Sequence, residues 1–582
     1  MTGAHLPAMV APMSLTPPAS VAQERRPPEN SKHALGAWLR RSHAPGWSLA
    51  AGLVLGIVVL PIGAVLYLAA TATDNDWPHL LHTVLPVTLG QTLLLTLGTG
   101  TLTLITGTGT AWLVTMYRFP GRALIDRLLV LPLAIPTYIA AYCYGDLFDY
   151  AGPVQSGLRS LFGWTAADYW FPSVRSLEGA VLIMSAVLYP YVYLAARASF
   201  VQQSVCALEV ARTLGCRSFR TFWSVALPLS RPALAAGVAL VAMETLNDLG
   251  AVQHLGVETL SASIYATWLQ RANLGGAAQI ASVMLVLIFV LLAGERMARG
   301  GAKVHHTTGR YRAIPFQDIE GWRGYAVAAL CALPFVLGFV IPFLQLAKSA
   351  VGHASVAIEG GFLRAAANSV LLATLAALAA IALAVLLSYA PRVARTRFTG
   401  AAAQISGFGY ALPGTVLALG VLIPLAALDN GIDELARTYL GVSTGLILSG
   451  SIAALVYAYA IRFLAVARGG IEAGLERISP NLDAAARALG ESAGSTLRRI
   501  HLPLLAPALG AAGLLVFVDA LKELPTTLLL RPFNFDTLAT HVYAFAALEQ
   551  IESGALGSLT IVLVGLIPLV GLHRTIAGRT GS

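Results

Sequence analysis

Charged side chains are scarce in this chain. Only 12% of its 582 residues are Asp, Glu, Lys or Arg, whereas 56% are hydrophobic. Soluble proteins carry about 25% charged residues, so the composition excludes an ordinary soluble domain and predicts an integral membrane protein. The formal net charge of +9 fits Lys and Arg on the loops at one face of a membrane. We therefore expect no nucleic-acid partner, and expect membrane lipid around most of the chain.

The sequence also lacks the usual motifs of catalytic and metal sites. Its four cysteines have no CxxC spacing and no histidine partners at metal-site spacing. Neither an HExxH motif nor the GxxxxGK[ST] phosphate loop is present. We expect no catalytic residue, no metal site and no cofactor bound by this chain, so any ATP must be hydrolysed by a separate subunit.

Long apolar runs fill the chain after residue 45. A helix needs about 20 apolar residues to cross a bilayer. Twelve runs qualify, namely about 47–72, 88–116, 128–148, 178–202, 231–254, 277–298, 322–347, 364–390, 402–428, 443–468, 506–530 and 554–574. We expect an all-α, polytopic membrane protein with about twelve transmembrane helices.

These runs divide into two sets of six. Residues 1–45 are rich in Pro, Ala, Ser and charge, which is typical of a disordered tail. We expect one repeat at 46–298, a cytoplasmic linker at 299–321 and a second repeat at 322–582.

Basic residues favour one orientation of these helices. Arg and Lys concentrate in alternate loops, whereas the first loop contains Asp74 and Asp76 and neither Lys nor Arg. Because positive loops face the cytoplasm, both termini are expected there. Six spans separate equivalent points of the two sets, so the repeats are parallel.

A polar segment occurs once in each half. Residues 208–215 and 225–228 correspond to 483–490 and 500–503, with an offset of 275 between Gly215 and Gly490. Other pairs extend the repeat, since Thr92 corresponds to Ser369 and Pro136 to Pro413 at an offset of 277, and Thr259 to Thr537 at 278. In each copy we expect a short helix that ends at glycine, before Leu-Pro begins the next span.

This segment resembles the EAA loop of ABC importer permeases, in which Glu-Ala-Ala, three residues, Gly and nine residues precede Ile-x-Leu-Pro. The first copy has Glu209 at the Glu position, and the second has Ala484 there with Asp483 one position earlier. The resemblance implies that each loop couples to one subunit of a homodimeric cytoplasmic ATPase. It also implies a periplasmic substrate-binding protein and a location in the bacterial inner membrane.

The candidate coupling residues belong to the two copies of this loop. Small side chains let another surface approach closely, and arginines can donate charge-assisted hydrogen bonds outwards. They are Glu209, Ala211, Arg212, Gly215, Leu227, Pro228, Ala486, Arg487, Gly490, Leu502 and Pro503.

Flanking segments narrow the resemblance. Residues 243–250, 254–259 and 522–532 resemble fused permeases for ferric iron. Fused thiamine permeases and some phosphonate permeases share this architecture, so the substrate stays open among them. An ion-coupled secondary transporter also uses six-plus-six repeats, but it has no role for the repeated loops.

Two polar trios lie inside predicted spans at an offset of 275. They are Glu244, Asn247 and Asp248 in the fifth span and Asp519, Lys522 and Glu523 in the eleventh. Spacing of i, i+3 and i+4 places each trio on one helix face. A charge at the centre of a span costs roughly 2.5–3.5 kcal/mol, so these faces should avoid lipid. They form either a translocation path or gate, or polar contacts that fix helix packing.

Further features accompany the trios. Gly250 and Pro525 follow them closely and should break each helix. Tyr138, Tyr142 and Tyr144 follow the Ile-Pro step of the third span. Their phenol oxygens could bind ferric iron, whereas aromatic anchoring at the membrane interface is the alternative.

Overall fold

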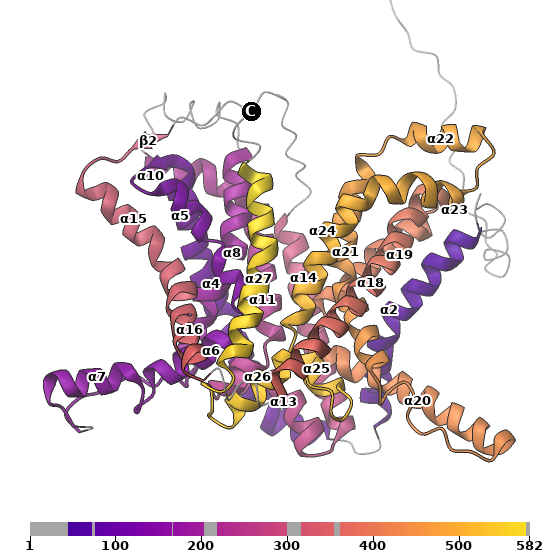
Figure 1. The fold of residues 1–582 in the computed structure, drawn as a ribbon, viewed down its shortest axis with the longest axis horizontal. Coiled ribbons are helices and arrows are strands. Elements are labelled where there is room, and N and C mark those ends of the chain that lie inside the picture. The colour runs from indigo at the N-terminus through magenta and orange to yellow at the C-terminus, as the bar shows by residue number, and fades with distance from the viewer. Residues whose placement is uncertain are drawn as a thin grey trace, which may run out of the picture.

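The computed structural model describes residues 45–72, 76–165, 167–202, 218–299, 316–353 and 361–577. These residues are almost entirely helical (Figure 1), which confirms the all-α membrane fold. The described part contains one pair of two-residue strands, in which β1 (Tyr117–Arg118) runs parallel to β2 (Gln317–Asp318). This pair joins the end of the predicted linker to the first half, a contact that the sequence did not predict.

The helices of the first half follow the predicted runs. They are α2 (Pro45–Thr71), α3 (Trp77–His79), α4 (Leu85–Met116), α5 (Arg122–Leu128), α6 (Thr137–Phe148), α7 (Pro153–Phe162), α8 (Leu177–Gln202), α10 (Ser218–Thr221), α11 (Leu227–Asn247), α12 (Gly250–His254), α13 (Leu260–Tyr265) and α14 (Leu274–Arg299). Short π- and 3₁₀-helical turns adjoin them, namely η1 (Leu80–Val84), η2 (Leu131–Ala134), η3 (Phe222–Ala226) and η4 (Ala266–Gln270).

The second half repeats this order. Its helices are α15 (Trp322–Phe335), α16 (Ile341–Gly352), α18 (Leu363–Ala394), α19 (Arg397–Ser406), α20 (Gly414–Leu440), α21 (Ile452–Glu476), α22 (Pro480–Ala488), α23 (Ala493–Thr496), α24 (Leu502–Leu521), α25 (Pro525–Leu530), α26 (Leu538–Ala547) and α27 (Ala555–Ala577). Its irregular turns are η5 (Val336–Val340), η7 (Gly407–Ala411) and η8 (Leu497–His501).

The number of uninterrupted spans is lower than predicted. Ten described helices are long and apolar enough to cross a membrane, and an eleventh span is bent by 93° between Arg122–Ala134 and Thr137–Phe162. The bend falls at Ile135, which is extended because the residue before a proline avoids the helical region. The twelfth predicted run, 554–574, coincides with α27.

The ninth and eleventh predicted runs are each divided in the structure. Leu412, before Pro413, is extended and separates η7 from α20, which matches the break at Ile135 in the first half. The run at 506–530 contains α24 and α25 as two separate helices.

The two halves share an internal contact at equivalent positions. The Leu260 amide donates to Thr92 Oγ1 at 2.9 Å, and the Leu538 amide donates to Ser369 Oγ at 2.7 Å. These pairs are related by the offsets of 277 and 278 found in the sequence. The matching contacts hold the starts of α13 and α26 against α4 and α18 at equivalent positions.

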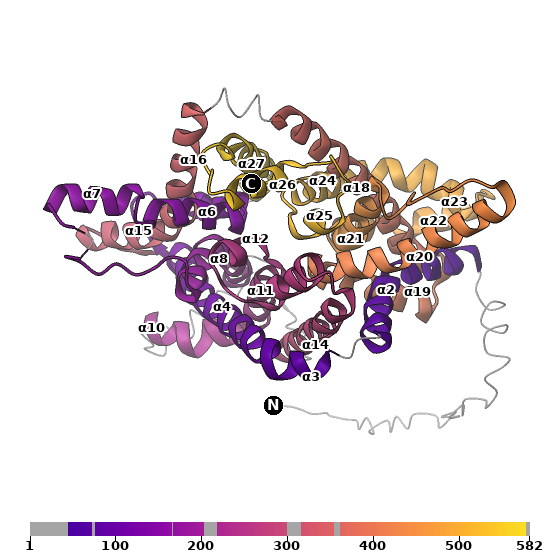
Figure 2. The same ribbon diagram turned by 90° about the horizontal axis from the view of Figure 1, so that it is seen from below.

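The first helices of each half are exchanged in space. Helix α2 packs against α18, α19 and α20 of the second half as well as against α14 of its own. Helix α15 packs against α5 of the first half, and α16 packs against α6 of the first half as well as against α27 of its own (Figure 2). The exchange brings backbones close together: a Cβ on Gly420 would lie 2.4 Å from Pro61 O, and one on Gly338 would lie 2.0 Å from Ala186 O. The halves are therefore interlocked rather than separate bodies.

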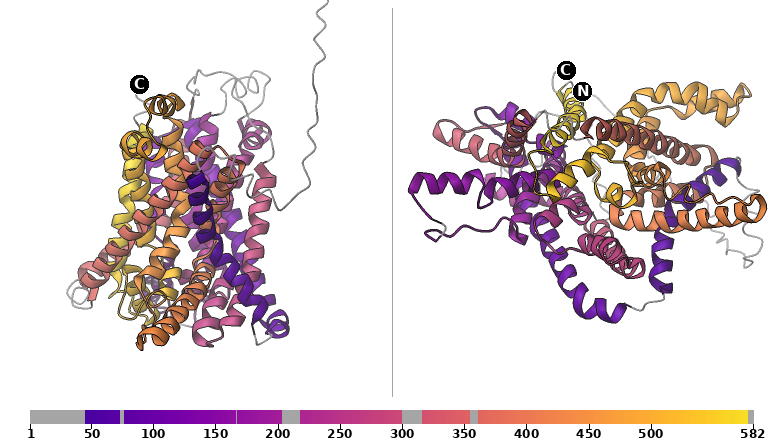
Figure 3. Two further views of the ribbon diagram at one scale, coloured as in Figure 1. Left: turned by 90° about the vertical axis from the view of Figure 1, so that its right-hand side faces the viewer. Right: turned by 60° about the horizontal axis from the view of Figure 1, so that its bottom comes forward.

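The molecule has two distinct ends. Helix α22 lies at one end, while α7 and the end of α20 project outwards at the other (Figure 1). Helix α27 ends, and α2 begins, towards the α22 end (Figures 1 and 3). The predicted tail at 1–45 and linker at 299–321 fall largely outside the described residues, so the predicted domain boundaries stay predictions.

Candidate functional site

Both polar helices break close to the predicted positions, but the breaks fall inside the trios. Asp248, Lys522 and Glu523 lie between helices and not on one helix face with the rest of each trio, which corrects that expectation. Helix α11 ends at Asn247 and α12 begins at Gly250, while α24 ends at Leu521 and α25 begins at Pro525. The last acid of each trio then caps the short helix that follows. Asp248 Oδ1 accepts from the Ala251 amide at 2.9 Å, and Glu523 Oε1 accepts from the Thr526 amide at 3.1 Å. These acids thus satisfy backbone groups that each break exposes.

One central cavity of about 90 Å³ brings both trios together. All six candidate path residues line it: Glu244, Asn247, Asp248, Asp519, Lys522 and Glu523. A water molecule occupies about 30 Å³ of liquid volume, so the space is suited to a few waters or a small ion. The cavity lies where α11 and α12 of one half meet α24 and α25 of the other.

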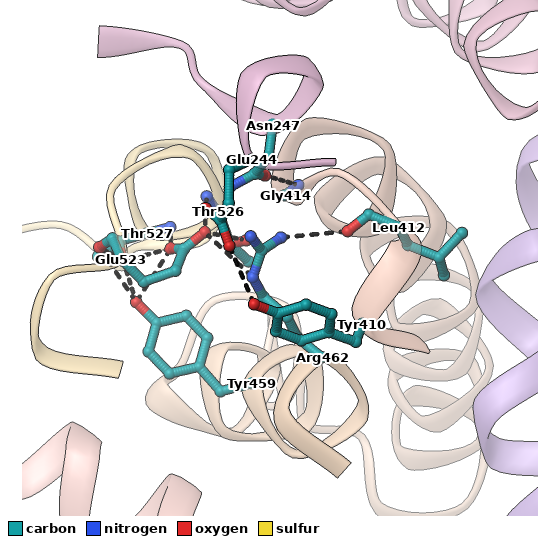
Figure 4. A network of polar contacts seen from close by, with 10 residues as sticks. All are labelled: Glu244, Asn247, Tyr410, Leu412, Gly414, Tyr459, Arg462, Glu523, Thr526 and Thr527. Atoms are coloured by element: carbon teal, nitrogen blue, oxygen red, sulfur yellow. Dashed lines mark hydrogen bonds and ion pairs between the residues drawn. The ribbon is translucent and has the colours of Figure 1, made fainter. Parts of the chain in front are cut away.

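Glu244 and Asn247 reach across to the second half (Figure 4). Tyr410 donates its hydroxyl to Glu244 Oε1 at 2.9 Å, and the Gly414 amide donates to Asn247 Oδ1 at 2.7 Å. Gly414 is the first residue of α20 and its amide has no acceptor within its own helix. The first trio therefore also holds the two halves together.

The second trio is satisfied within its own half. Lys522 Nζ lies 2.9 Å from Asp519 Oδ1. Glu523 Oε2 accepts from the Tyr459 hydroxyl at 3.2 Å, and Thr526 Oγ1 donates to Glu523 Oε1 at 2.7 Å (Figure 4). The two trios occupy equivalent positions but differ in their partners.

Arg462 is a cavity residue that sequence reasoning missed. Its side chain is 7% exposed, its Nε lies 4.0 Å from Glu523 Oε1, and its Nη1 donates to Leu412 O at 3.1 Å. The sequence did contain an indication of it, because Arg462 is a charged residue inside an apolar run and such residues often have a functional role in membrane proteins.

The cavity has an excess of acidic side chains. Four carboxylates line it, from Glu244, Asp248, Asp519 and Glu523, whereas Lys522 and Arg462 are the two basic residues among the lining side chains. Within the described ranges, no group of three His, Cys, Asp or Glu residues is arranged to hold a metal ion. The site can therefore attract a cation without forming a closed metal cage.

The second copy of the repeated loop forms helix α22. Gly490 has φ +80°, which favours glycine, and the Glu491 amide donates to Ala486 O at 3.0 Å. This is the helix ending expected at the glycine. Leu502 and Pro503 then begin α24, as Leu227 and Pro228 begin α11, and proline is tolerated at this position.

The orientation of α22 corrects one expectation. Arg487 is exposed, as a partner contact requires, but Ala486 is only 3% exposed and faces the protein itself. Neighbouring residues of a helix point in different directions, so Ala486 packs against the protein while Arg487 points outwards. The exposed small residues are Ala484, Ala485 and Ala488 instead.

Asp483 fastens α22 to the membrane helices. Its carboxylate accepts from Arg392 Nε at 2.8 Å and lies 2.7 Å from His501 Nε2. Arg392 also donates to Leu475 O and Ile478 O, both at 2.9 Å. Burial acts to raise the pKa of Asp483, but the hydrogen bonds from Arg392 and His501 outweigh it and lower the pKa. Sequence reasoning missed both partners. His501 lies inside the second copy of the motif, at its unspecified position, and Arg392 lies outside the motif in α18.

The first copy of the loop cannot be compared in this way. Residues 203–217, with Glu209, Ala211, Arg212 and Gly215, lie outside the described residues.

Known proteins match this chain over different lengths. Residues 102–297 match the family described as "Binding-protein-dependent transport system inner membrane component". The Fe(3+)-transport system permease protein FbpB 2 of Haemophilus influenzae is 25% identical over 468 residues, which covers 80% of this chain and 85% of the relative.

Shorter relatives cover about half of the chain or less. The sulfate transport system permease protein CysT of Escherichia coli is 30% identical over 43% of this chain and 90% of its own length. The molybdenum transport system permease protein ModB of Escherichia coli is 30% identical over 39% of this chain and 95% of its own length. This chain, with its interlocked helices and repeated polar loop, belongs to the family of inner membrane components of binding-protein-dependent transport systems.

Proposed function

We propose that this chain is the permease subunit of an ATP-binding-cassette importer that carries ferric iron across the bacterial inner membrane. The observation that carries the substrate assignment is the central cavity, in which four carboxylates face two basic groups. Ferric iron is a hard cation, and hard cations prefer oxygen ligands. The relative that covers most of this chain is named as an Fe(3+)-transport permease, which supports the same substrate.

The charge of the cavity weighs against the substrates of other relatives. Those relatives are named for sulfate and molybdenum transport, and an oxyanion would meet an excess of like charge beside Glu244 and Asp248. Thiamine is a cation and stays the main alternative. A phosphonate is the other alternative, but as an anion it would meet the same excess of like charge. The cavity of about 90 Å³ suits a small ion better than an organic molecule.

The coupling proposal rests on α22. Its exposed face presents Arg487 between small residues, while Asp483 ties its other face to α18 and η8. A separate homodimeric ATPase would bind ATP and move this helix, and the segment with Glu209, Ala211, Arg212 and Gly215 would serve the other ATPase subunit. The chain itself binds no cofactor in this scheme.

This scheme fixes the orientation. The α22 end faces the cytoplasm and both termini lie there, because the motif needs a cytoplasmic ATPase and the arginine-rich loops favour that side. The α7 end then faces the periplasm, where a substrate-binding protein delivers iron.

Uptake by the complete transporter tests the proposal. The chain, its ATPase and its binding protein are expressed in cells without other ferric uptake, and accumulation of radiolabelled ferric iron, thiamine, sulfate and molybdate is compared. We expect ATP-dependent uptake of ferric iron alone. Uptake of another substrate would refute the iron assignment, and uptake driven by an ion gradient without the ATPase would refute the importer class.

A further inference from the structure

We propose that Tyr138, Tyr142 and His254 form an access route in the first half of the chain, along which ferric iron moves from a cavity at the α7 end to the central cavity. The inference rests on the proposed function for the identity of the ion. It adds ligand positions outside the two polar trios.

A second cavity lies at the α7 end. Its volume is about 430 Å³, and its lining includes Gly145, Phe148, Asp149, Tyr169 and Arg175. Asp149 and Arg175 place both signs of charge at this opening, and Arg175 is paired with Glu549 at 3.0 Å.

Helix α6 connects the two cavities. Thr137 and Tyr138 at its start line the central cavity, whereas Gly145 and Phe148 near its end line the outer one. At 1.5 Å per residue the helix covers roughly 16 Å between Thr137 and Phe148. The route between the cavities is therefore about three helical turns long.

Three aromatic polar side chains follow one another along this route. The Tyr138 and Tyr142 ring centroids lie 5.8 Å apart, and the Tyr142 and His254 centroids lie 4.8 Å apart. A Cβ on Gly145 would lie 2.5 Å from His254 Nε2. The glycine thus leaves the imidazole nitrogen room beside the lining of the outer cavity.

The polar atoms of these side chains lack partners. Tyr138 and Tyr142 are 4% and 2% exposed, and within the described chain no hydrogen-bond partner reaches either hydroxyl or His254 Nε2. Buried polar atoms are nearly always hydrogen-bonded, so each exception calls for a reason. Tyr144 on the same helix shows the contrast, since its hydroxyl donates to Leu337 O at 2.5 Å.

The second half offers no equivalent route. At the offset of 277, Thr415 and Leu419 replace the two tyrosines, and at the offset of 275 Leu529 replaces His254. The three groups are therefore not part of the packing that the repeats share. Their presence in one half points to a role that the other half does not need.

The chemistry of the three groups suits ferric iron in transit. Phenol oxygens and an imidazole nitrogen can replace some of the water around a hard cation. Each of the three groups alone would bind the ion only weakly. The carboxylates of Asp248 and Glu523 line the central cavity at the start of α6. Weak sites in series allow the ion both to enter and to leave.

Single substitutions in the complete transporter test the route. Tyr142→Phe and His254→Leu should slow ferric uptake by about tenfold each, because each removes one ligand that lowers the barrier to passage. Both should keep the wild-type thermal midpoint or raise it, since neither removes a hydrogen bond. ATPase activity stimulated by the binding protein should be unchanged.

Tyr144→Phe is the matched control. It should lower the thermal midpoint, because Leu337 O loses its donor, and should leave uptake per folded transporter unchanged. If the wild type carries ferric iron and Tyr142→Phe and His254→Leu carry it at the wild-type rate, the access route is refuted while the proposed function stands. If the wild type carries no ferric iron, the proposed function itself fails.

Discussion

Replacing Asp483 with alanine should uncouple α22 from the membrane helices. The side chains of Asp483 and Arg392 are 16% and 18% exposed, so their contact is largely shielded from water. A hydrogen bond to a charged group contributes about 1.5–3 kcal/mol. Arg392 keeps two backbone acceptors in the variant, so the loss should be about 3 kcal/mol for both Asp483 contacts together. A loss of that size lowers the ratio of α22 helices packed on the membrane helices to those detached from them by about two orders of magnitude.

The assay compares ATP hydrolysis with ferric uptake in the assembled transporter. We expect Asp483→Ala to hydrolyse ATP with much lower uptake per ATP, because movement of the ATPase no longer reaches α18 and η8.

Glu491→Ala is the control on the same loop. Its partner Arg499 lies 3.0 Å away, but the two side chains are 35% and 72% exposed, and exposed ion pairs contribute only about 0–1 kcal/mol. We expect little change in this variant. Normal uptake per ATP in a folded Asp483→Ala transporter would refute the anchoring role.

Three further changes test other parts of the account. The pKa of Asp483 is lowered in the folded protein, so the stability that this carboxylate contributes is fully present above its unfolded pKa and is lost only as the pH falls through its folded pKa. Uptake per ATP should therefore stay constant when a neutral buffer is made mildly acidic. A loss of uptake per ATP near neutral pH would contradict this role of Asp483. Arg462→Met should cost about 3–5 kcal/mol, because it leaves Glu523 buried without a cation, and a thermal midpoint equal to the wild type would contradict this. Thr537→Val should cost about 1 kcal/mol by removing the cap of α26, measured in the same thermal assay, and a change as large as that of Arg462→Met would contradict a simple capping role.

The repeat made the centre of the site predictable from sequence. Two trios with helical spacing and one offset had to occupy equivalent positions in two equivalent halves. The cost of placing Glu244 or Lys522 in lipid then left few places for them other than the junction of those halves. A break near each trio was also predictable from Gly250 and Pro525, but its position inside the trio was not, because these two residues begin the next helices.

Other features depend on contacts that the sequence does not encode locally. Arg462 and Tyr410 reach the cavity from parts of the chain far from either trio, so spacing could not associate them with it. The exchange of α2 and α15 between halves involves residues far apart in the chain, such as Gly420 beside Pro61 and Gly338 beside Ala186. The inward face of Ala486 follows from how α22 is fastened by Asp483, which no motif specifies.

The most direct test of the cavity as a cation path is ferric uptake by proteoliposomes that contain the permease, its ATPase and its binding protein. The wild type is compared with Glu244→Gln combined with Asp519→Asn, which keeps the side-chain shapes and removes two negative charges. We predict ATP-dependent accumulation of ferric iron by the wild type and at least about a tenfold loss in the variant. Wild-type accumulation by the variant, or a wild type that accumulates sulfate or molybdate instead, would contradict the account.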